Sequence, residues 1–420
     1  MWNKFTLIFR DPDLRKKFLY LLGFLAFFRL AASIPVPGID AERLRSFFAT
    51  NQFFGLLNLF SGGVLSNLSI MMLGVGPYIT SSIIMQLLTM IFPSLKEMYQ
   101  EDGEAGRQKF NQYSRLITVP LAFIQGFGLL TILQRQGILQ LTFSHKIFDL
   151  IIVVAGSILL MWIGELISEY AIGNGVSILI FAGIVSRFPN DFRQTLISYD
   201  SSQLLTYLAY IFITVITVAA VVTISEGERQ LPVYYAKRVR GMKMYGGFST
   251  HLPLRVNQAG VIPIIFALSI LLFPQMIANF FSSSGNFILR AISSTVVNFL
   301  ANQWTYAISY FILVVLFTYF YTAVTFDPGS VSENLQKSGA FIPGIRPGPS
   351  TSEFLHKIVS RITLVGALFL GVIAILPLIL RAITGITTLA IGGTALLIVV
   401  SVVLETAKQV EAQLSLRDYE

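Results

Sequence analysis

Ten apolar stretches, separated by polar segments, constrain the fold of this chain more than any other feature. Of its 420 residues, 54% are hydrophobic and only 12% are charged. A helix needs about 20 mainly apolar residues to cross the hydrocarbon core of a bilayer. The expected spans are residues 18–34, 71–92, 115–134, 148–167, 176–188, 204–224, 257–278, 304–325, 358–380 and 386–405. The sequence therefore predicts an all-α polytopic membrane protein with ten transmembrane helices.

The segment between the first two spans has an unusual composition. Residues 58–69 are half polar and contain adjacent glycines, and they lead directly into a span interrupted by Gly74, Gly76 and Pro77. Lipid cannot satisfy free backbone N–H and C=O groups, so irregular backbone at membrane depth must line a water-accessible cavity or be buried in protein. The pattern indicates a pore or a transport pathway. Taken alone, the polar run could also be an ordinary extracellular amphipathic turn.

The distribution of positive charge predicts the orientation of the chain. Its formal net charge is +8, and most lysines and arginines fall in alternate loops, on the side of the basic N-terminus. Cytoplasmic loops of membrane proteins carry this excess, so we expect both termini in the cytoplasm. The first apolar stretch lacks the small-residue cleavage pattern of a secretory signal, and we interpret it as a retained span.

The order of the spans suggests two halves. Residues 1–200 would carry spans one to five, residues 201–405 spans six to ten, and residues 406–420 a short cytoplasmic tail. Because five is odd, the second half would begin on the opposite face, which makes the halves an inverted repeat with a pathway between them. The cytoplasmic loops 225–256 and 326–356 are longer than adjacent helices require, and loops of this length usually bind a partner.

An ordered set of short motifs resembles one protein family. They are residues 34–38 (IPVPG), 60–63 (FSGG), 77–79 (PYI), 103–107 (GEAGR), 172–175 (IGNG), 249–254 (STHLPL) and 339–348 (GAFIPGIRPG). Each motif alone would be a chance event, but the ordered set runs from the first span to the tenth. In this set the chain resembles the SecY/Sec61 alpha family of protein-conducting channels.

The resemblance implies a central hourglass pore closed by a short plug half-helix and by a ring of apolar side chains. The plug falls at about residues 58–69, and its central residues are Phe60, Ser61, Gly62, Gly63, Val64, Leu65, Ser66 and Asn67. The ring positions are Val75, Ile79, Val176, Ile180, Ile265 and Ile398. Such a ring could exclude ions by dewetting and still yield to a passing chain. Without the resemblance, valine and isoleucine in membrane helices are usually lipid-facing or packed.

The resemblance also implies a lateral gate toward lipid, between spans two and three on one half and seven and eight on the other. Polar residues in these spans are costly in lipid and plausible at a gate. The candidates are Gln86, Thr89, Asn257 and Gln258. For the last two, a place at the interface where a helix starts is an equally good interpretation.

The basic residues of the two long loops are candidates for partner docking. They are Lys237, Arg238, Arg240, Lys243 and Arg346. Prolines and glycines on both sides of Arg346 would fix it at a loop tip, suited to contact with phosphate or carboxylate. Solvated loops that obey the positive-inside rule are the alternative. By resemblance the partners are the SecA motor ATPase, the ribosome, the small subunits SecE and SecG, unfolded preproteins with their signal sequences, and the lipid of a bacterial plasma membrane.

Catalytic chemistry is not indicated. The chain has no cysteine, its three histidines fall in separate loops, and it lacks a Walker-type nucleotide-binding sequence. Glu165 and Glu169 are one helical turn apart, but exposure at the cytoplasmic end of a span explains them well. We expect no enzyme activity, no cofactor and no metal, so a partner must supply the energy. The competing hypotheses are a secondary transporter of a small solute and an intramembrane hydrolase. Both would need ionisable or nucleophilic residues deep in the spans, and this chain has almost none there.

Overall fold

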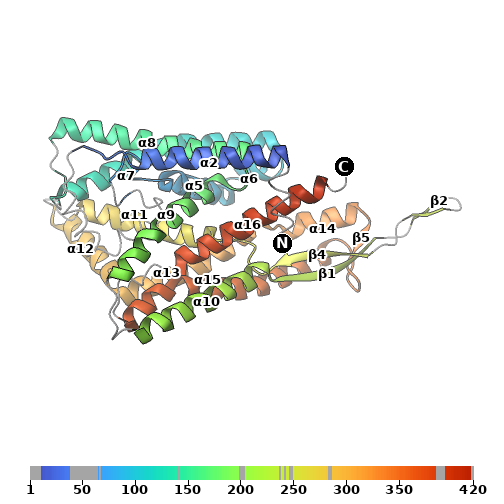
Figure 1. Ribbon diagram of the computed structural model, residues 1–420. Coiled ribbons are helices and arrows are strands. Elements are labelled where there is room, and N and C mark those ends of the chain that lie inside the picture. Colours follow the sequence, from blue (N-terminus) through green and yellow to red (C-terminus); the bar gives the residue numbers. More distant parts are fainter. Residues whose placement is uncertain are drawn as a thin grey trace. The chain divides into compact units, whose positions relative to one another are not determined.

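The computed structural model describes residues 11–37, 65, 68–135, 137–139, 142–197, 204–235, 238–240, 243–245, 249–281, 286–384 and 393–417 (Figure 1). The chain forms two compact units. The first comprises residues 1–203, 268–305 and 402–420, and the second comprises residues 204–267 and 306–401.

The first unit is helical in its described part. Its helices are α2 (Pro12–Ala32), α5 (Gly76–Ile91), α6 (Pro93–Gln100), α7 (Gly103–Arg135), α8 (Phe143–Tyr170), α9 (Gly175–Ile197) and α12 (Phe287–Ala301). Helix α7 packs against α5, α6 and α8, while α8 also contacts α2 and α9. Helices α7 and α8 therefore connect the other helices of this group, α2, α5, α6 and α9.

The second unit combines helices with a small sheet. Its elements are α10 (Leu204–Glu226), β1 (Glu228–Tyr235), β2 (Arg238–Arg240), β3 (Lys243–Tyr245), β4 (Ser249–Arg255), α14 (Pro328–Lys337), β5 (Ala340–Phe341) and α15 (Pro349–Thr384). Three further helices begin in one unit and end in the other: α11 (Ile262–Phe281), α13 (Gln303–Thr325) and α16 (Gly393–Arg417).

Helices lie at all ten positions where spans are expected, and the prediction of an all-α polytopic membrane protein is confirmed. Among the described residues, five stretches are long and apolar enough by themselves to cross a bilayer, and they fall on α7, α8, α10, α13 continued by α14, and α15. Helices α5 and α6 pass this test only as a pair, bent by 117°. The apolar parts of α9 and α11 are shorter, at Gly175–Ser186 and Ile262–Leu271.

The second expected span differs in its first turns. A helix is expected from residue 71, but α5 begins at Gly76, after a series of turns at residues 70–75. Gly74 has a φ of +61°, which a continuing right-handed helix cannot accommodate. Pro77 then occupies the first turn of α5, where its missing N–H leaves no partner unsatisfied.

The two long loops predicted for partner binding contain strands and a helix in their described residues. Strand β1 pairs antiparallel with β4, both from the first loop, and also with β5 from the second loop, giving the order β4-β1-β5. A buried apolar cluster joins this sheet to α15, and its members include Leu231, Val233, Leu254 and Leu355. Figure 1 shows β2 beyond the ends of β1 and β4, so the hairpin extends out from the sheet.

Candidate functional site

The irregular entry to α5 is held by small residues of α8. The Ser157 hydroxyl donates a hydrogen bond to the carbonyl oxygen of Gly74 over 3.0 Å. At the neighbouring Gly156, a Cβ atom would overlap the backbone oxygen of Ile70. The turns before α5 thus approach the backbone of α8 as closely as a glycine permits, and a buried hydroxyl satisfies one of their free carbonyl groups.

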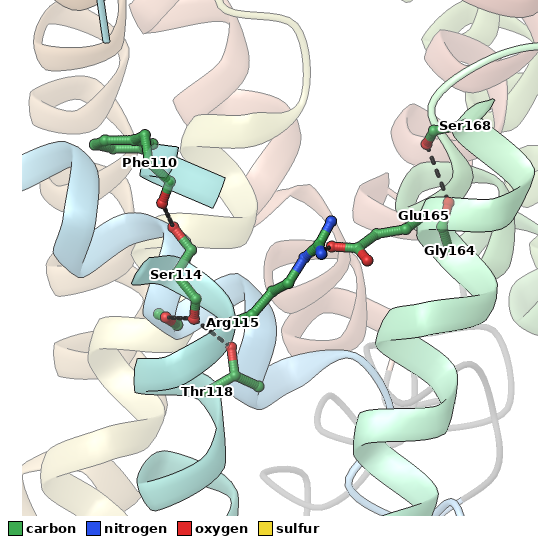
Figure 2. A network of polar contacts seen from close by, with 8 residues as sticks. Phe110, Ser114, Arg115, Thr118, Gly164, Glu165 and Ser168 are labelled. Carbon is green, nitrogen blue, oxygen red and sulfur yellow. Dashed lines mark hydrogen bonds and ion pairs between the residues drawn. The ribbon is translucent and has the colours of Figure 1, made fainter. Parts of the chain in front are cut away.

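The start of α9 is attached to the same helix in a similar way. A Cβ atom at Gly175 would overlap the carbonyl oxygen of Gly164. The Gly175 N–H donates to Ser168 Oγ over 2.8 Å. The Ser168 hydroxyl in turn donates to the Gly164 oxygen over 3.0 Å, as Figure 2 shows. Just before this contact, Gly173 has a φ of +95°, a backbone conformation that favours glycine.

Four of the six predicted ring residues lie beside these two attachments or one helical turn beyond them. Val75 is the N-cap residue of α5, and Ile79 donates its N–H to the Val75 oxygen over 3.0 Å. Val176 follows Gly175 at the start of α9, and Ile180 lies one turn further. Gly156 and Gly164 are eight residues apart on α8, about 12 Å along its axis. The structure therefore brings both predicted pairs onto one supporting helix.

The other two predicted ring residues belong to the second unit. Ile265 lies on α11 and Ile398 lies on α16, and both are buried. The closed ring of six side chains therefore stays a prediction.

Polar contacts fix α5, α7 and α8 relative to one another. The Ser81 hydroxyl on α5 and the Thr118 hydroxyl on α7 both donate to the carbonyl oxygen of Ser114, over 2.5 and 2.7 Å. Figure 2 shows Arg115 reaching from α7 to Glu165 on α8, where Nε lies 2.6 Å from Oε1. The Glu165 carboxylate thus has a structural partner, which supports the interpretation that it forms no functional pair with Glu169.

Of the predicted plug, about residues 58–69, the structure describes Leu65, Leu68 and Ser69. Leu65 is fully buried in an apolar cluster with Leu68, Val36, Leu129 and other residues of the first unit. Backbone pairing reinforces this contact, since Val36 donates its N–H to the Leu68 oxygen over 2.9 Å. The other plug residues, Phe60, Ser61, Gly62, Gly63, Val64, Ser66 and Asn67, lie outside the described part of the chain.

The predicted gate residues contain buried polar atoms without partners. Gln86 donates from Nε2 to the Ser82 hydroxyl over 3.4 Å, but its Oε1 is buried and bonds to nothing in the described residues. The Thr89 hydroxyl donates to the backbone oxygen of Gln86 over 2.7 Å. This second contact satisfies Thr89 within its own helix.

Asn257 and Gln258 lie in the turn before α11. Asn257 donates from Nδ2 to the Gly260 oxygen over 3.2 Å, while Asn257 Oδ1 and Gln258 Oε1 are buried without a partner among the described residues. The contact to Gly260 ties Asn257 to the turn that leads into α11. Buried carbonyl oxygens without donors are costly, so a further polar group or water is expected near both residues.

The loop that carries Arg346 is rigid, as its prolines and glycines predict. Gly344 and Gly348 have φ values of +79° and +100°. The Ser332 hydroxyl on α14 donates to the Gly348 oxygen over 2.7 Å, and the Thr351 hydroxyl donates to the Arg346 oxygen over 2.8 Å. Arg346 itself is exposed. Its backbone is thus fixed while its guanidinium is free to meet a partner in solution.

The remaining docking candidates belong to the hairpin beyond the sheet. Arg238, at one end of β2, pairs with Tyr245, and Arg240, at the other end, pairs with Lys243 of β3. Lys237 lies outside the described residues. Docking of a partner by this hairpin stays a prediction.

Sequence reasoning missed the supporting residues on α8. Gly156, Ser157, Gly164 and Ser168 contact the two attached segments, yet none was selected as a site residue. A signal was available, because small residues at regular spacing in a membrane helix mark close helix contacts. Within the described residues, no group of three or more histidine, cysteine, aspartate or glutamate side chains could hold a metal ion.

Comparisons with known proteins agree with this architecture. A family model described as SecY matches residues 69–407. Proteins named "Protein translocase subunit SecY" from Corynebacterium glutamicum and Thermus thermophilus are each 43% identical to this chain. The first alignment covers 98% of both chains, and the second covers 100% of this chain and 97% of the relative.

Solved structures share the fold at lower identity. One described as "The structure of a protein conducting channel" has a TM-score of 0.64 at 19% identity and covers 96% of this chain and 93% of its own. Another, "Sec61 in the Canine ribosome-channel complex from the endoplasmic reticulum", has a TM-score of 0.60 at 19% identity with the same coverage. Because the family model spans most of the chain and the relatives match its full length, this protein belongs to the SecY family.

Proposed function

We propose that this protein is the channel-forming subunit of a bacterial protein translocase. It would pass unfolded secretory polypeptides across the plasma membrane and release transmembrane segments laterally into lipid. The full-length relatives are named as protein translocase subunits, and the structural relatives are protein-conducting channels. This family membership favours a channel over a small-solute transporter or an intramembrane hydrolase.

The observation that carries the proposal is the pair of interrupted helices supported by α8. Helix α5 has only 16 residues, and the turns before it leave backbone groups that lipid could not satisfy. Helix α9 likewise begins at a glycine pressed against α8. Irregular backbone of this kind is tolerated where it borders a cavity, which supports the assignment of Val75, Ile79, Val176 and Ile180 to the wall of a pore. Ile265 and Ile398 would complete the ring from the second unit.

The plug and the lateral gate are parts of the same proposal. Leu65 and Leu68 anchor the C-terminal part of the proposed plug in an apolar cluster, so the preceding residues could leave the pore while that part stays attached. The unpartnered amide oxygens of Gln86, Asn257 and Gln258 support a gate, because such atoms gain partners when polar groups or water enter between the helices.

Partners and orientation are inferred from charge and from the ordered loops. The basic hairpin and the fixed Arg346 suit phosphates of ribosomal RNA or carboxylates of the SecA motor. SecE and SecG would be the membrane partners. Both termini would face the cytoplasm, since the sheet and its basic hairpin lie in the loops with most positive charge.

The first test is translocation by the complete channel. The chain is first combined with SecE and SecG in vesicles. SecA, ATP and an unfolded precursor are then added, and the amount of precursor protected from protease is measured. We expect ATP-dependent protection, and Arg346→Glu should reduce it severalfold while the protein remains folded. Lys357→Glu, the same charge change at an exposed position on the regular helix α15, is the control. Lack of protection with the unaltered chain would contradict the channel, whereas full protection with Arg346→Glu would contradict only the docking role.

A further inference from the structure

Helix α12 combines one buried side with two exposed sides of opposite character. Ser293 is only 4% exposed, and Val296, Val297 and Leu300 are partly buried on the same side. Ile288, Ile292 and Phe299 form an apolar stripe beside it, with exposures of 66%, 57% and 53%. At about 100° per residue, these positions fall within about 40° of one another around the helix axis.

A polar stripe occupies the third side of α12. Arg290, Ser294 and Asn298 recur every four residues, and all three are exposed; in the first turn Phe287 is exposed on the same side, so the polar stripe begins at Arg290. The centre of this stripe lies about 140° around the axis from the centre of the apolar stripe. A helix surrounded by water gains nothing from exposed isoleucine and phenylalanine on one side. A helix at a boundary between an apolar and an aqueous phase needs this arrangement.

Both ends of α12 are capped, and the second end leads directly into α13. Asn286 caps its first turn by accepting from the Ile288 N–H over 3.0 Å. Asn302 then ends α12 and caps α13, since its Oδ1 accepts from the N–H groups of Trp304 and Thr305 over 3.0 and 3.3 Å. One residue separates the two helices, so the C-terminal end of α12 must lie at the level where α13 begins.

Helix α13 shows where the lipid begins. It belongs to a stretch long and apolar enough to cross a bilayer. Its outward side carries Trp304, Ile308, Ile312 and Leu316, each more than half exposed and each four residues from the next. Tryptophan is enriched at the boundary between lipid and water. The lipid-facing side of α13 therefore starts at Trp304, directly beside the end of α12.

From this continuity we propose that α12 is an interfacial helix bound to the lipid surface. Ile288, Ile292 and Phe299 enter the boundary of the acyl chains, while Arg290, Ser294 and Asn298 face water and the lipid phosphates. In the orientation proposed above, this surface belongs to the outer leaflet. The lipid contact itself does not depend on polypeptide transport, so it can be tested separately from the channel function.

The absence of cysteine from the chain makes a site-specific test possible. Single cysteines replace Ile292 and Phe299 on the apolar stripe and Ser294 and Asn298 on the polar stripe. Each variant carries an environment-sensitive fluorophore and is placed, with its membrane partners, in lipid nanodiscs, where aqueous reagents reach both faces. Fluorescence quenching is measured with nitroxide-labelled phospholipid and separately with iodide.

We expect severalfold stronger quenching by the nitroxide lipid at positions 292 and 299, and severalfold stronger quenching by iodide at positions 294 and 298. Equal iodide quenching at all four positions would overturn the proposal, because it would place α12 in water. Protection of positions 292 and 299 from both quenchers would also overturn it, since a protein would then cover the apolar stripe. All substituted positions are exposed, and unchanged thermal unfolding of each variant confirms that the fold is retained.

Discussion

At the scale of single residues, glycines on α8 and α9 decide how closely the helices approach. The Cβ of an alanine at position 156 would overlap the backbone oxygen of Ile70, which cannot move without disturbing the turns before α5. We expect Gly156→Ala to destabilise the protein by about 1–3 kcal/mol, the usual cost of overpacking. The midpoint of thermal unfolding in nanodiscs should fall accordingly.

Gly23→Ala is the matched control. Gly23 lies within α2, and nothing lies within 4 Å of the position where its Cβ would be. Alanine favours a helix over glycine by up to about 1 kcal/mol, so this variant should be as stable as the parent or slightly more stable. Equal effects at both positions would show that the contact between α8 and the turns is looser than the structure indicates.

At the scale of elements, the sheet depends on its contact with α15. Leu355 is fully buried in the cluster that includes Leu231, Val233 and Leu254. We expect Leu355→Ala to weaken this cluster by about 2–5 kcal/mol, because the smaller side chain leaves a cavity. Limited proteolysis should then cleave residues 225–256 much faster, since cleavage follows the population of the opened form.

Val365→Ala, on the same helix, provides the comparison. Val365 is 55% exposed, so its truncation leaves no cavity in the cluster. Cleavage of the loop in this variant should match the parent. Unchanged proteolysis with Leu355→Ala would mean that the sheet is stable without its contact to α15.

At the scale of the whole molecule, the proposed ring draws residues from both units. Ile79→Gly together with Ile265→Gly should raise the ion conductance of the reconstituted channel severalfold, because the apolar constriction would widen and hydrate. The measurement is single-channel current in a planar bilayer. Ile308→Gly with Ile312→Gly controls for the loss of helix propensity, since both residues are exposed on α13. A conductance equal to that of the control pair would remove these two residues from the ring.

The family and the class of fold could be predicted from the sequence. The ordered motifs led to the SecY family, and apolar stretches of about 20 residues led to membrane helices, since both signals are local in the chain. The rigidity of the Arg346 loop could be predicted for the same reason, because prolines and glycines restrict their own backbone. The positions of the ring, plug and gate stay predictions that rest on the resemblance.

The tertiary structure decided what local patterns cannot encode. The turns before α5 are signalled locally by Gly74, Gly76 and Pro77, but a serine and a glycine of α8, about 80 residues later in the chain, support them. The pairing of β1 with β5 joins two loops that are separated by several helices. The attachment of α5 and α9 to α8 also rests on contacts between residues that are far apart in the sequence. In each case the determining contact lies between residues far apart in the sequence. Hydropathy and turn signals are read within one segment, so they carry no information about which distant segment will pack against it.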